Sequence, residues 1–140
     1  MFWKRVSEYL FLLGAGGTLY YAIEILYRGF SHWSMFLLGG TCFCFFWWQG
    51  SSLCWKEPLW VQTIRAGIFV TACEFITGII VNKWLGWDVW DYSNQTVHLF
   101  GQICLSFAGF FTILSVFGIL LSGKIMHFLF GEKNPKYRLL

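Results

Sequence analysis

Residues 66–85 have the sequence AGIFVTACEFITGIIVNKWL, an almost uninterrupted apolar run with a single acidic residue, Glu74, near its middle. About 20 helical residues cross the roughly 30 Å hydrocarbon layer of a membrane, so this run predicts a transmembrane helix. Three further apolar stretches of similar length lie at residues 9–27, 35–55 and 97–121. None of them alternates apolar with polar residues, which favours helices over a membrane barrel.

Charged residues make up only 12% of the chain and hydrophobic residues 57%, whereas soluble domains carry about 25% charged residues. A small soluble domain leaves much of its surface in water and could not hide so much apolar area. We therefore predict one transmembrane domain over residues 1–140, an all-α membrane protein of four transmembrane helices. The net charge of +3 does not indicate nucleic acid, because the basic residues flank the apolar runs.

The basic residues predict the orientation, since Lys and Arg concentrate on cytoplasmic loops. If the N-terminus is cytoplasmic, only Arg28 and Lys83 among the 10 Lys and Arg residues lie outside. The others then lie inside, namely Lys4, Arg5, Lys56, Arg65, Lys124, Lys133, Lys136 and Arg138. We expect both termini in the cytoplasm and a tail, residues 122–140, along the inner interface, with membrane lipid as a partner.

Motifs for cofactors, metals and catalysis are absent from the sequence. The five cysteines are odd in number and lie in apolar segments, so we interpret them as small buried hydrophobic residues. No phosphate-binding G-x4-G-K-[ST] loop, nucleophile elbow or H-E-x-x-H helix occurs. We expect no cofactor and no metal.

A weak internal repeat relates the two halves of the chain. The same spacing separates Gly17 from Glu24 and Gly67 from Glu74. Two related hairpins of two helices each would explain this pattern. Small residues let membrane helices approach closely, so we expect the glycine faces to point inward.

Glu74 is the first candidate site residue, because a charge in mid-membrane is costly and is usually functional. It must be protonated, or paired with a donor or a cation. The predicted fourth helix offers His98 and Gln102 on one face, and Asn82 lies on the stripe of Glu74. Two interpretations stay open: a functional carboxyl, or a neutral one that bonds Gln102 or Asn82 and holds helices together.

Three other features have a simple and a functional interpretation. Glu24 and Arg28 are four residues apart on one helix, where an ion pair suffices to explain them. His98 is either an ordinary interfacial residue or a ligand. The segment 84–93, WLGWDVWDYS, has tryptophans three residues apart, which predicts a short amphipathic helix on the outer surface. It would act as a lid over a site or as a membrane-anchored connector.

Several motifs together resemble one known family. They are Tyr27-Arg28-Gly29-x-Ser31-His32-Trp33-Ser34-Met35-Phe36 with Gly39-Gly40, then Glu74-x-x-Thr77-Gly78 with Asn82, Trp90-Asp91-Tyr92-Ser93, and Gly101-Gln102-Ile103-Cys104. The combination resembles the putative ABC-transporter type IV permease family of bacteria, although Thr96 and His98 stand where that family is expected to have Pro and Asn. The resemblance implies a bacterial inner membrane and the convergence of Arg28, His32, Glu74, Asn82, Asp91 and Gln102.

Three functions fit these observations. In a transport subunit, Glu74 and Glu24 would bind a proton or a cationic group, within a homodimer or a larger complex that could include a separate ATPase subunit. In a membrane enzyme acting on a lipid or lipid-linked substrate, Arg28, His32, Asp91 and Glu74 would form one polar site. In a non-catalytic adaptor, the small-residue faces would pack on a partner.

Overall fold

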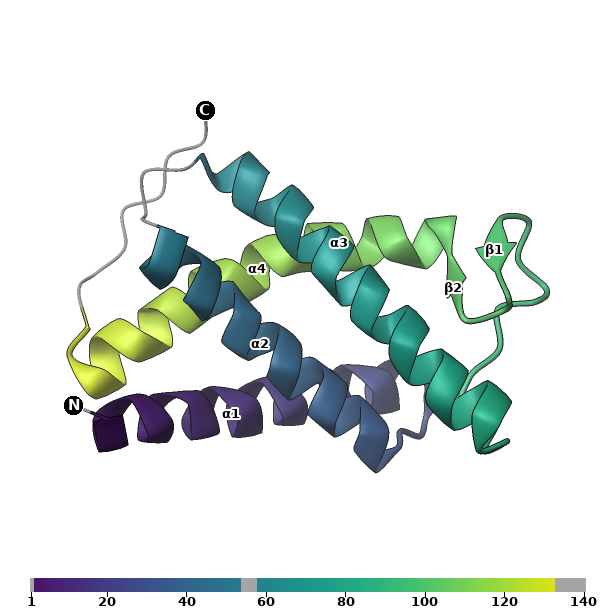
Figure 1. Cartoon of the computed structure of the whole chain (residues 1–140), viewed down its shortest axis with the longest axis horizontal. Helices are drawn as coiled ribbons and strands as arrows, with labels where there is room; N and C mark the ends of the chain where they lie inside the picture. The colour runs from purple at the N-terminus through teal and green to yellow at the C-terminus, as the bar shows by residue number, and fades with distance from the viewer. Residues whose placement is uncertain (1, 54–57, 133–140) are drawn as a thin grey trace.

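The computed structural model describes residues 2–53 and 58–132, and most of them are helical. The helices are α1 (Phe2–Arg28), α2 (Trp33–Leu53), α3 (Leu59–Gly78), the π-helix η1 (Ile79–Trp84) that continues α3, and α4 (Leu105–Phe130). Two short strands, β1 (His98–Leu99) and β2 (Ile103–Cys104), pair antiparallel just before α4. The long helices run in alternating directions (Figure 1).

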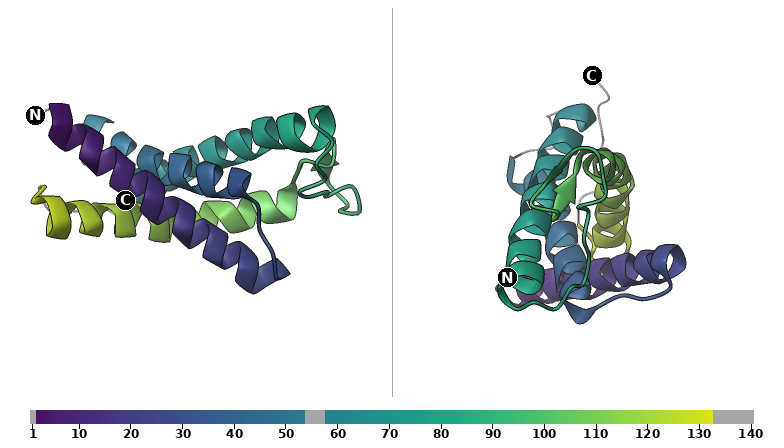
Figure 2. Two further views of the ribbon diagram at one scale, coloured as in Figure 1. Left: turned by 90° about the horizontal axis from the view of Figure 1, so that it is seen from below. Right: turned by 90° about the vertical axis from the view of Figure 1, so that its right-hand side faces the viewer.

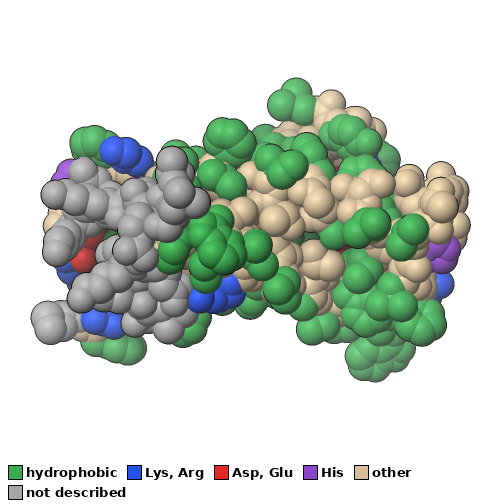
Figure 3. Space-filling model, turned by 90° about the horizontal axis from the view of Figure 1, so that it is seen from above, with side chains coloured by type: hydrophobic (Ala, Val, Ile, Leu, Met, Phe, Trp, Pro, Cys, Tyr) green, Lys and Arg blue, Asp and Glu red, His purple; other side chains and the backbone are tan. Residues whose placement is uncertain are grey.

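The outer faces of the helices are apolar, as expected for a membrane protein. In the described part of the chain, three helices are long and apolar enough to cross a membrane: α1, α3 with η1, and α4. Large side chains such as Leu10, Ile68 and Ile113 are more than half exposed. On the face in Figure 3, hydrophobic side chains are spread among the tan atoms of the middle and right-hand part, and most of the charged and histidine side chains lie towards the two ends. Lipid satisfies such a surface and water does not.

Helices α1 and α2 approach so closely that their backbones nearly touch. A Cβ atom added to Gly17 would lie 2.6 Å from the backbone oxygen of Phe36, and one on Gly16 would lie 2.8 Å from that of Gly39. Helices in lipid associate through such small-residue packing. The short connector between Arg28 and Trp33 permits this arrangement of neighbours.

Helices α3 and α4 form the second closely packed pair. Gly67 of α3 faces the side chain of Thr112 on α4, with no room for a Cβ atom. The rings of Phe45 on α2 and Phe69 on α3 stack with centroids 3.9 Å apart and join the two pairs. The predicted internal repeat between the two halves stays a prediction.

The prediction of a short amphipathic helix over residues 84–93 is wrong. After η1 the chain forms an irregular loop through residues 85–97 (the outer loop), in which Gly86 has a φ of +68°. Its tryptophans do not share one face: Trp87 packs on the His32 ring, whereas Trp90 is buried. A helix is excluded because the Asn82 side chain, and not a backbone carbonyl of the same turn, accepts the N–H of Val89.

The ends of α4 also differ from the predicted segment 97–121. Residues 97–104 form the β1–β2 hairpin and not the first turns of a helix, because Phe100 and Gly101 adopt positive φ angles of 54° and 71°. At the other end α4 continues to Phe130, so the first part of the predicted tail is helical. The remainder of the tail, residues 133–140, and Lys56 lie outside the described residues.

Candidate functional site

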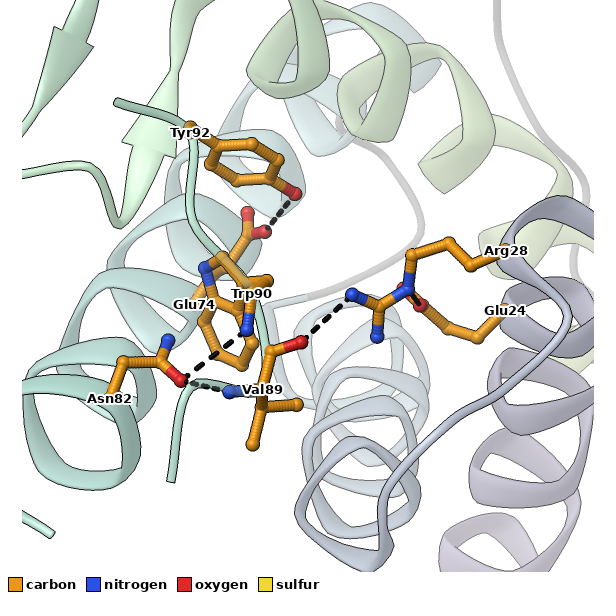
Figure 4. A network of polar contacts seen from close by, with 7 residues as sticks. All are labelled: Glu24, Arg28, Glu74, Asn82, Val89, Trp90 and Tyr92. Atoms are coloured by element: carbon orange, nitrogen blue, oxygen red, sulfur yellow. Dashed lines mark hydrogen bonds and ion pairs between the residues drawn. The ribbon is translucent and has the colours of Figure 1, made fainter. Parts of the chain in front are cut away.

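Glu74 lies on α3 with 4% of its surface exposed. Its Oε1 atom accepts a 3.0 Å hydrogen bond from the hydroxyl group of Tyr92 in the outer loop (Figure 4). Burial, together with the Glu74 carboxyl, raises the pKa of the Tyr92 phenol well above its ordinary value, so Tyr92 stays protonated and donates. Among residues 2–53 and 58–132, no ion pair joins Glu74 to a Lys or an Arg.

Asn82 and Gln102 form a buried amide pair that shapes the outer loop. Asn82 Nδ2 donates to Gln102 Oε1 at 2.7 Å, while Asn82 Oδ1 accepts the backbone N–H of Val89 at 2.6 Å. The indole N–H of Trp90 donates to the backbone oxygen of Gln102 at 2.9 Å. Gln102 precedes α4 and does not lie on a helical face. The two amides bond each other, and Glu74 bonds Tyr92. The interpretation in which Glu74 bonds Gln102 or Asn82 and holds helices together is therefore wrong.

Glu24 and Arg28 form an ion pair at the end of α1, with 2.6 Å between Glu24 Oε2 and Arg28 Nε. The Nη1 atom of Arg28 donates a 2.9 Å hydrogen bond to the backbone oxygen of Val89 (Figure 4). The guanidinium carbon also lies 4.5 Å from the ring centroid of Phe30. Arg28 therefore ties the end of α1 to the outer loop on the side opposite Asn82.

A cavity of about 250 Å³, here called the Glu74 cavity, brings these groups together. Its charged lining residues are Glu24, Arg28 and Glu74. Its other lining residues come from α1, the start of α2, the outer loop and α4 and are mostly aromatic: Tyr20, Ile23, Tyr27, Met35, Trp90, Tyr92, Ser106, Phe107, Phe110 and Phe111. In the same region the end of α1 diverges from the start of α4 (Figure 2).

Besides Asn82 and Gln102, three predicted site residues lie outside the lining of the Glu74 cavity. His32 shares a 2.7 Å hydrogen bond with Ser34 and packs on Trp87. Asp91 is exposed and accepts the backbone N–H of Ser93, which lowers the pKa of the Asp91 carboxyl. His98 Nδ1 accepts the backbone N–H of Gly101 at 3.0 Å and stabilises the β1–β2 turn. The structure therefore gathers Glu24, Arg28 and Glu74 and separates them from these three.

The aromatic lining was not predicted as part of the site. Tyr20 and Tyr27 lie on the face of α1 that carries Glu24, at helical spacings of four and three residues (24−20 and 27−24). That spacing could have indicated Tyr20 and Tyr27. The position of Tyr92 depends on the folded loop, and no local pattern indicates it.

The described residues offer no cluster of His, Cys, Asp and Glu side chains that could hold a metal ion. The four cysteines within these ranges, Cys42, Cys44, Cys73 and Cys104, are free. Cys54 lies outside the described residues. Carboxylates, one guanidinium and aromatic rings are thus the chemical groups of the site.

Comparison with known proteins shows the family to which the chain belongs. No curated protein and no solved structure matches it. A family model with the description "Putative ABC-transporter type IV" matches residues 9–138, which include every residue of the Glu74 cavity. A match over nearly the whole length shows that the chain belongs to the family described as putative ABC-transporter type IV.

Proposed function

We propose that this protein is a transport subunit of the bacterial inner membrane, in which Glu74 binds a proton or a cationic group. The observation that carries the proposal is the Glu74 cavity, where a buried carboxyl faces an ion pair and aromatic rings. An intramembrane carboxyl of this kind is typical of ion and substrate pathways. The family description, which refers to transport, agrees with it.

In the proposed arrangement α2 is the fourth transmembrane helix and both termini are cytoplasmic. The basic residues support this orientation, because Lys4, Arg5, Arg65 and Lys124 then lie inside and Arg28 and Lys83 outside. Glu74 is 10 residues before Trp84 (84−74), which corresponds to about 15 Å at the α-helical rise and slightly less because Ile79–Trp84 is a π-helix. That distance is half of the roughly 30 Å hydrocarbon layer, so Glu74 would lie near the membrane midplane.

Release of the bound cation to the outside would require the outer loop to move. Besides the bonds to Asn82 and Gln102, two contacts join the loop to groups of the cavity: the hydrogen bond from Arg28 to Val89, and the one from Tyr92 to Glu74. A proton or cation that binds Glu74 would compete with the Tyr92 hydroxyl for the carboxylate. Binding would thereby weaken one of the two contacts and favour opening.

The other two functions have less support. The enzyme hypothesis needs His32 and Asp91 beside Glu74, and both lie outside the cavity lining. The adaptor hypothesis needs a Glu74 with no cavity around it. Four helices enclose only a narrow path, so we also propose that the subunit acts as a homodimer or in a larger complex with lipid, to which a separate ATPase subunit could supply energy.

The experiment measures proton uptake in liposomes of phosphatidylethanolamine and phosphatidylglycerol that contain the purified protein. Pyranine inside the liposomes reports pH, and a potassium diffusion potential replaces any energy from an ATPase. We expect uptake above that of empty liposomes, and we expect Glu74→Gln to lower it about tenfold or more, because a neutral amide cannot take up the proton.

The matched control is Asp88→Asn, which removes the same charge from an exposed position of the outer loop. Asp88 has a φ of 49°, a conformation that Asn adopts readily, so the fold should not change. Uptake should be that of the unmodified protein. Equal uptake by Glu74→Gln and the unmodified protein, or none above empty liposomes, would contradict the proposed role of Glu74 in proton transport.

A further inference from the structure

We propose that the site takes an amphipathic organic cation, whose cationic group lies in the Glu74 cavity and whose apolar tail lies in a second cavity beside it. The proposal rests on the proposed function, because it names the substrate class of the same site. Three observations carry it: the charge balance, the aromatic walls and the adjoining apolar space.

The charge balance of the Glu74 cavity favours a cation. Its lining contains two carboxyl groups, Glu24 and Glu74, and one guanidinium group, Arg28. Arg28 is already engaged by Glu24 and by the backbone oxygen of Val89. With both carboxyls ionised, one negative charge remains, and it lies on Glu74, whose bonded neighbour is a neutral hydroxyl.

The walls favour an organic cation over a metal ion. Seven of the lining residues are aromatic: Tyr20, Tyr27, Trp90, Tyr92, Phe107, Phe110 and Phe111. Aromatic faces attract quaternary ammonium groups and replace part of their hydration. A hard metal ion instead prefers several carboxylate and carbonyl oxygens. One of the two carboxyl groups of the lining is paired with Arg28, and the other oxygen-bearing side chains are the hydroxyls of Ser106, Tyr20, Tyr27 and Tyr92.

A second cavity of about 210 Å³, here called the apolar cavity, lies next to the first. Tyr20, Ile23 and Phe111 line both, so the two adjoin at these side chains. The remaining walls of the apolar cavity are largely hydrophobic and come from α1, α2, α3 and α4. Together the two volumes fall in the range of about 300–1,000 Å³ for small-molecule sites.

Both cavities reach the lipid-facing surface where α1 and α4 meet. Phe110 lines the Glu74 cavity and Phe117 the apolar cavity, and 50% and 65% of their surfaces are exposed. A molecule with an apolar tail concentrates in the membrane before it binds. Entry from the side, between α1 and α4, would then bring the tail and the cationic group into the two cavities together.

The test measures equilibrium binding of radiolabelled decyltrimethylammonium to the protein in phosphatidylcholine nanodiscs, with empty nanodiscs as background. We expect saturable binding that unlabelled decyltrimethylammonium displaces and decyl sulfate, with the same tail and the opposite charge, does not. Glu74→Gln should weaken binding about tenfold or more. Glu74→Asp, which keeps the charge, should retain most of it and guards against a folding defect in the amide variant.

A second variant tests whether the apolar tail of the cation binds in the apolar cavity. Leu19 lines the apolar cavity and is 41% exposed, so Leu19→Trp should fill space there without disturbing the core. It should weaken decyltrimethylammonium about fivefold or more and leave the weaker binding of tetramethylammonium unchanged. Displacement by decyl sulfate, equal binding by Glu74→Gln, or no effect of Leu19→Trp on the decyl compound would overturn the proposal.

Binding in nanodiscs does not require transport, so the two proposals can fail separately. Saturable cation binding with no proton uptake in liposomes would contradict proton transport through Glu74 and leave the cation site standing. Proton uptake that depends on Glu74, with no saturable decyltrimethylammonium binding, would contradict the organic-cation site alone.

Discussion

Helix α1 packs closely against α2 and leaves cavities on the side that faces α4. On the α2 side, Gly16 and Gly17 leave no room for even a Cβ atom against the backbone of α2. On the α4 side, the Glu74 cavity and the apolar cavity lie along the line where α1 and α4 meet, here called the α1–α4 seam. One helix thus has a closely packed interface on one side and a seam that contains space on the other.

The difference between the two sides of α1 indicates which helices can move apart. Backbone contacts between helices cannot yield without separating the pair, so α1 and α2 should move as a unit. Polar contacts lie near the two ends of the α1–α4 seam. At one end Arg28 of α1 bonds the outer loop at Val89, and at the other Lys4 of α1 pairs with Glu132, just after α4, at 3.0 Å. Polar bridges of this kind can break and reform, so we expect the seam to be the part that opens.

The largest effect should come from breaking the closely packed interface. Gly17→Leu would place side-chain atoms against the Phe36 backbone, which cannot move aside, and should cost about 3 kcal/mol or more. Helicity and monodispersity of the purified protein on heating measure the loss. Gly14→Leu is the matched control, because nothing lies within 4 Å of its Cβ position. Equal stability of the two variants would show that the backbone approach is not what joins α1 to α2.

A smaller effect should follow from releasing the outer loop above the seam. Asn82→Ala leaves the Val89 N–H and the Gln102 side-chain oxygen without their partner and should cost about 2–3 kcal/mol. Hydrogen exchange of residues 85–93 should accelerate, while exchange in α1 and α2 should not change. Asn94→Ala, at an exposed position of the same loop, is the control. Unchanged exchange in Asn82→Ala would mean that other contacts hold the loop.

The smallest effect should come from the far end of the seam. The hydrogen bond with Glu8, and then the Lys4 ammonium, hold the pKa of Glu132 below its ordinary 4.5. A lowered pKa in the folded state adds stability above pH 4.5, and that stability is lost as the pH falls toward the lowered pKa. Glu132→Gln should therefore cost up to about 1 kcal/mol near neutral pH.

Thermal unfolding midpoints of Glu132→Gln and the unmodified protein, measured at neutral pH and well below pH 4.5, check this prediction. The difference between the two proteins should disappear at the acidic pH. A difference of the same size at both pH values would mean that the ionisation of Glu132 does not hold α1 to α4.

Sequence patterns predicted the helical segments better than the site. The apolar runs at residues 9–27 and 66–85 lie within α1 and within α3 and η1, apart from Leu85. The spacing of Glu24 and Arg28 was sufficient to predict their ion pair. The helix predicted over residues 84–93 does not form. Tryptophan spacing indicates a helix only if backbone N–H groups bond backbone carbonyls, and here the Asn82 side chain accepts the N–H of Val89.

The composition of the site depended on contacts between distant parts of the chain. The hydroxyl of Tyr92 bonds a carboxyl 18 residues earlier, and Arg28 bonds a backbone oxygen 61 residues later. Periodicity reports only neighbours three or four residues apart, so it could indicate Glu74 as costly without naming what surrounds it.

By itself, the sequence determined that the chain folds in lipid and that Glu74 lies deep within a helix, because hydropathy over about 20 residues is a local property. The tertiary structure decided which groups meet Glu74. It placed Tyr92 on the carboxyl, left His32 and Asp91 out of the cavity lining and left space along the α1–α4 seam. Those outcomes depend on how closely helices approach and where a loop is bonded, and both are set only when the whole chain packs.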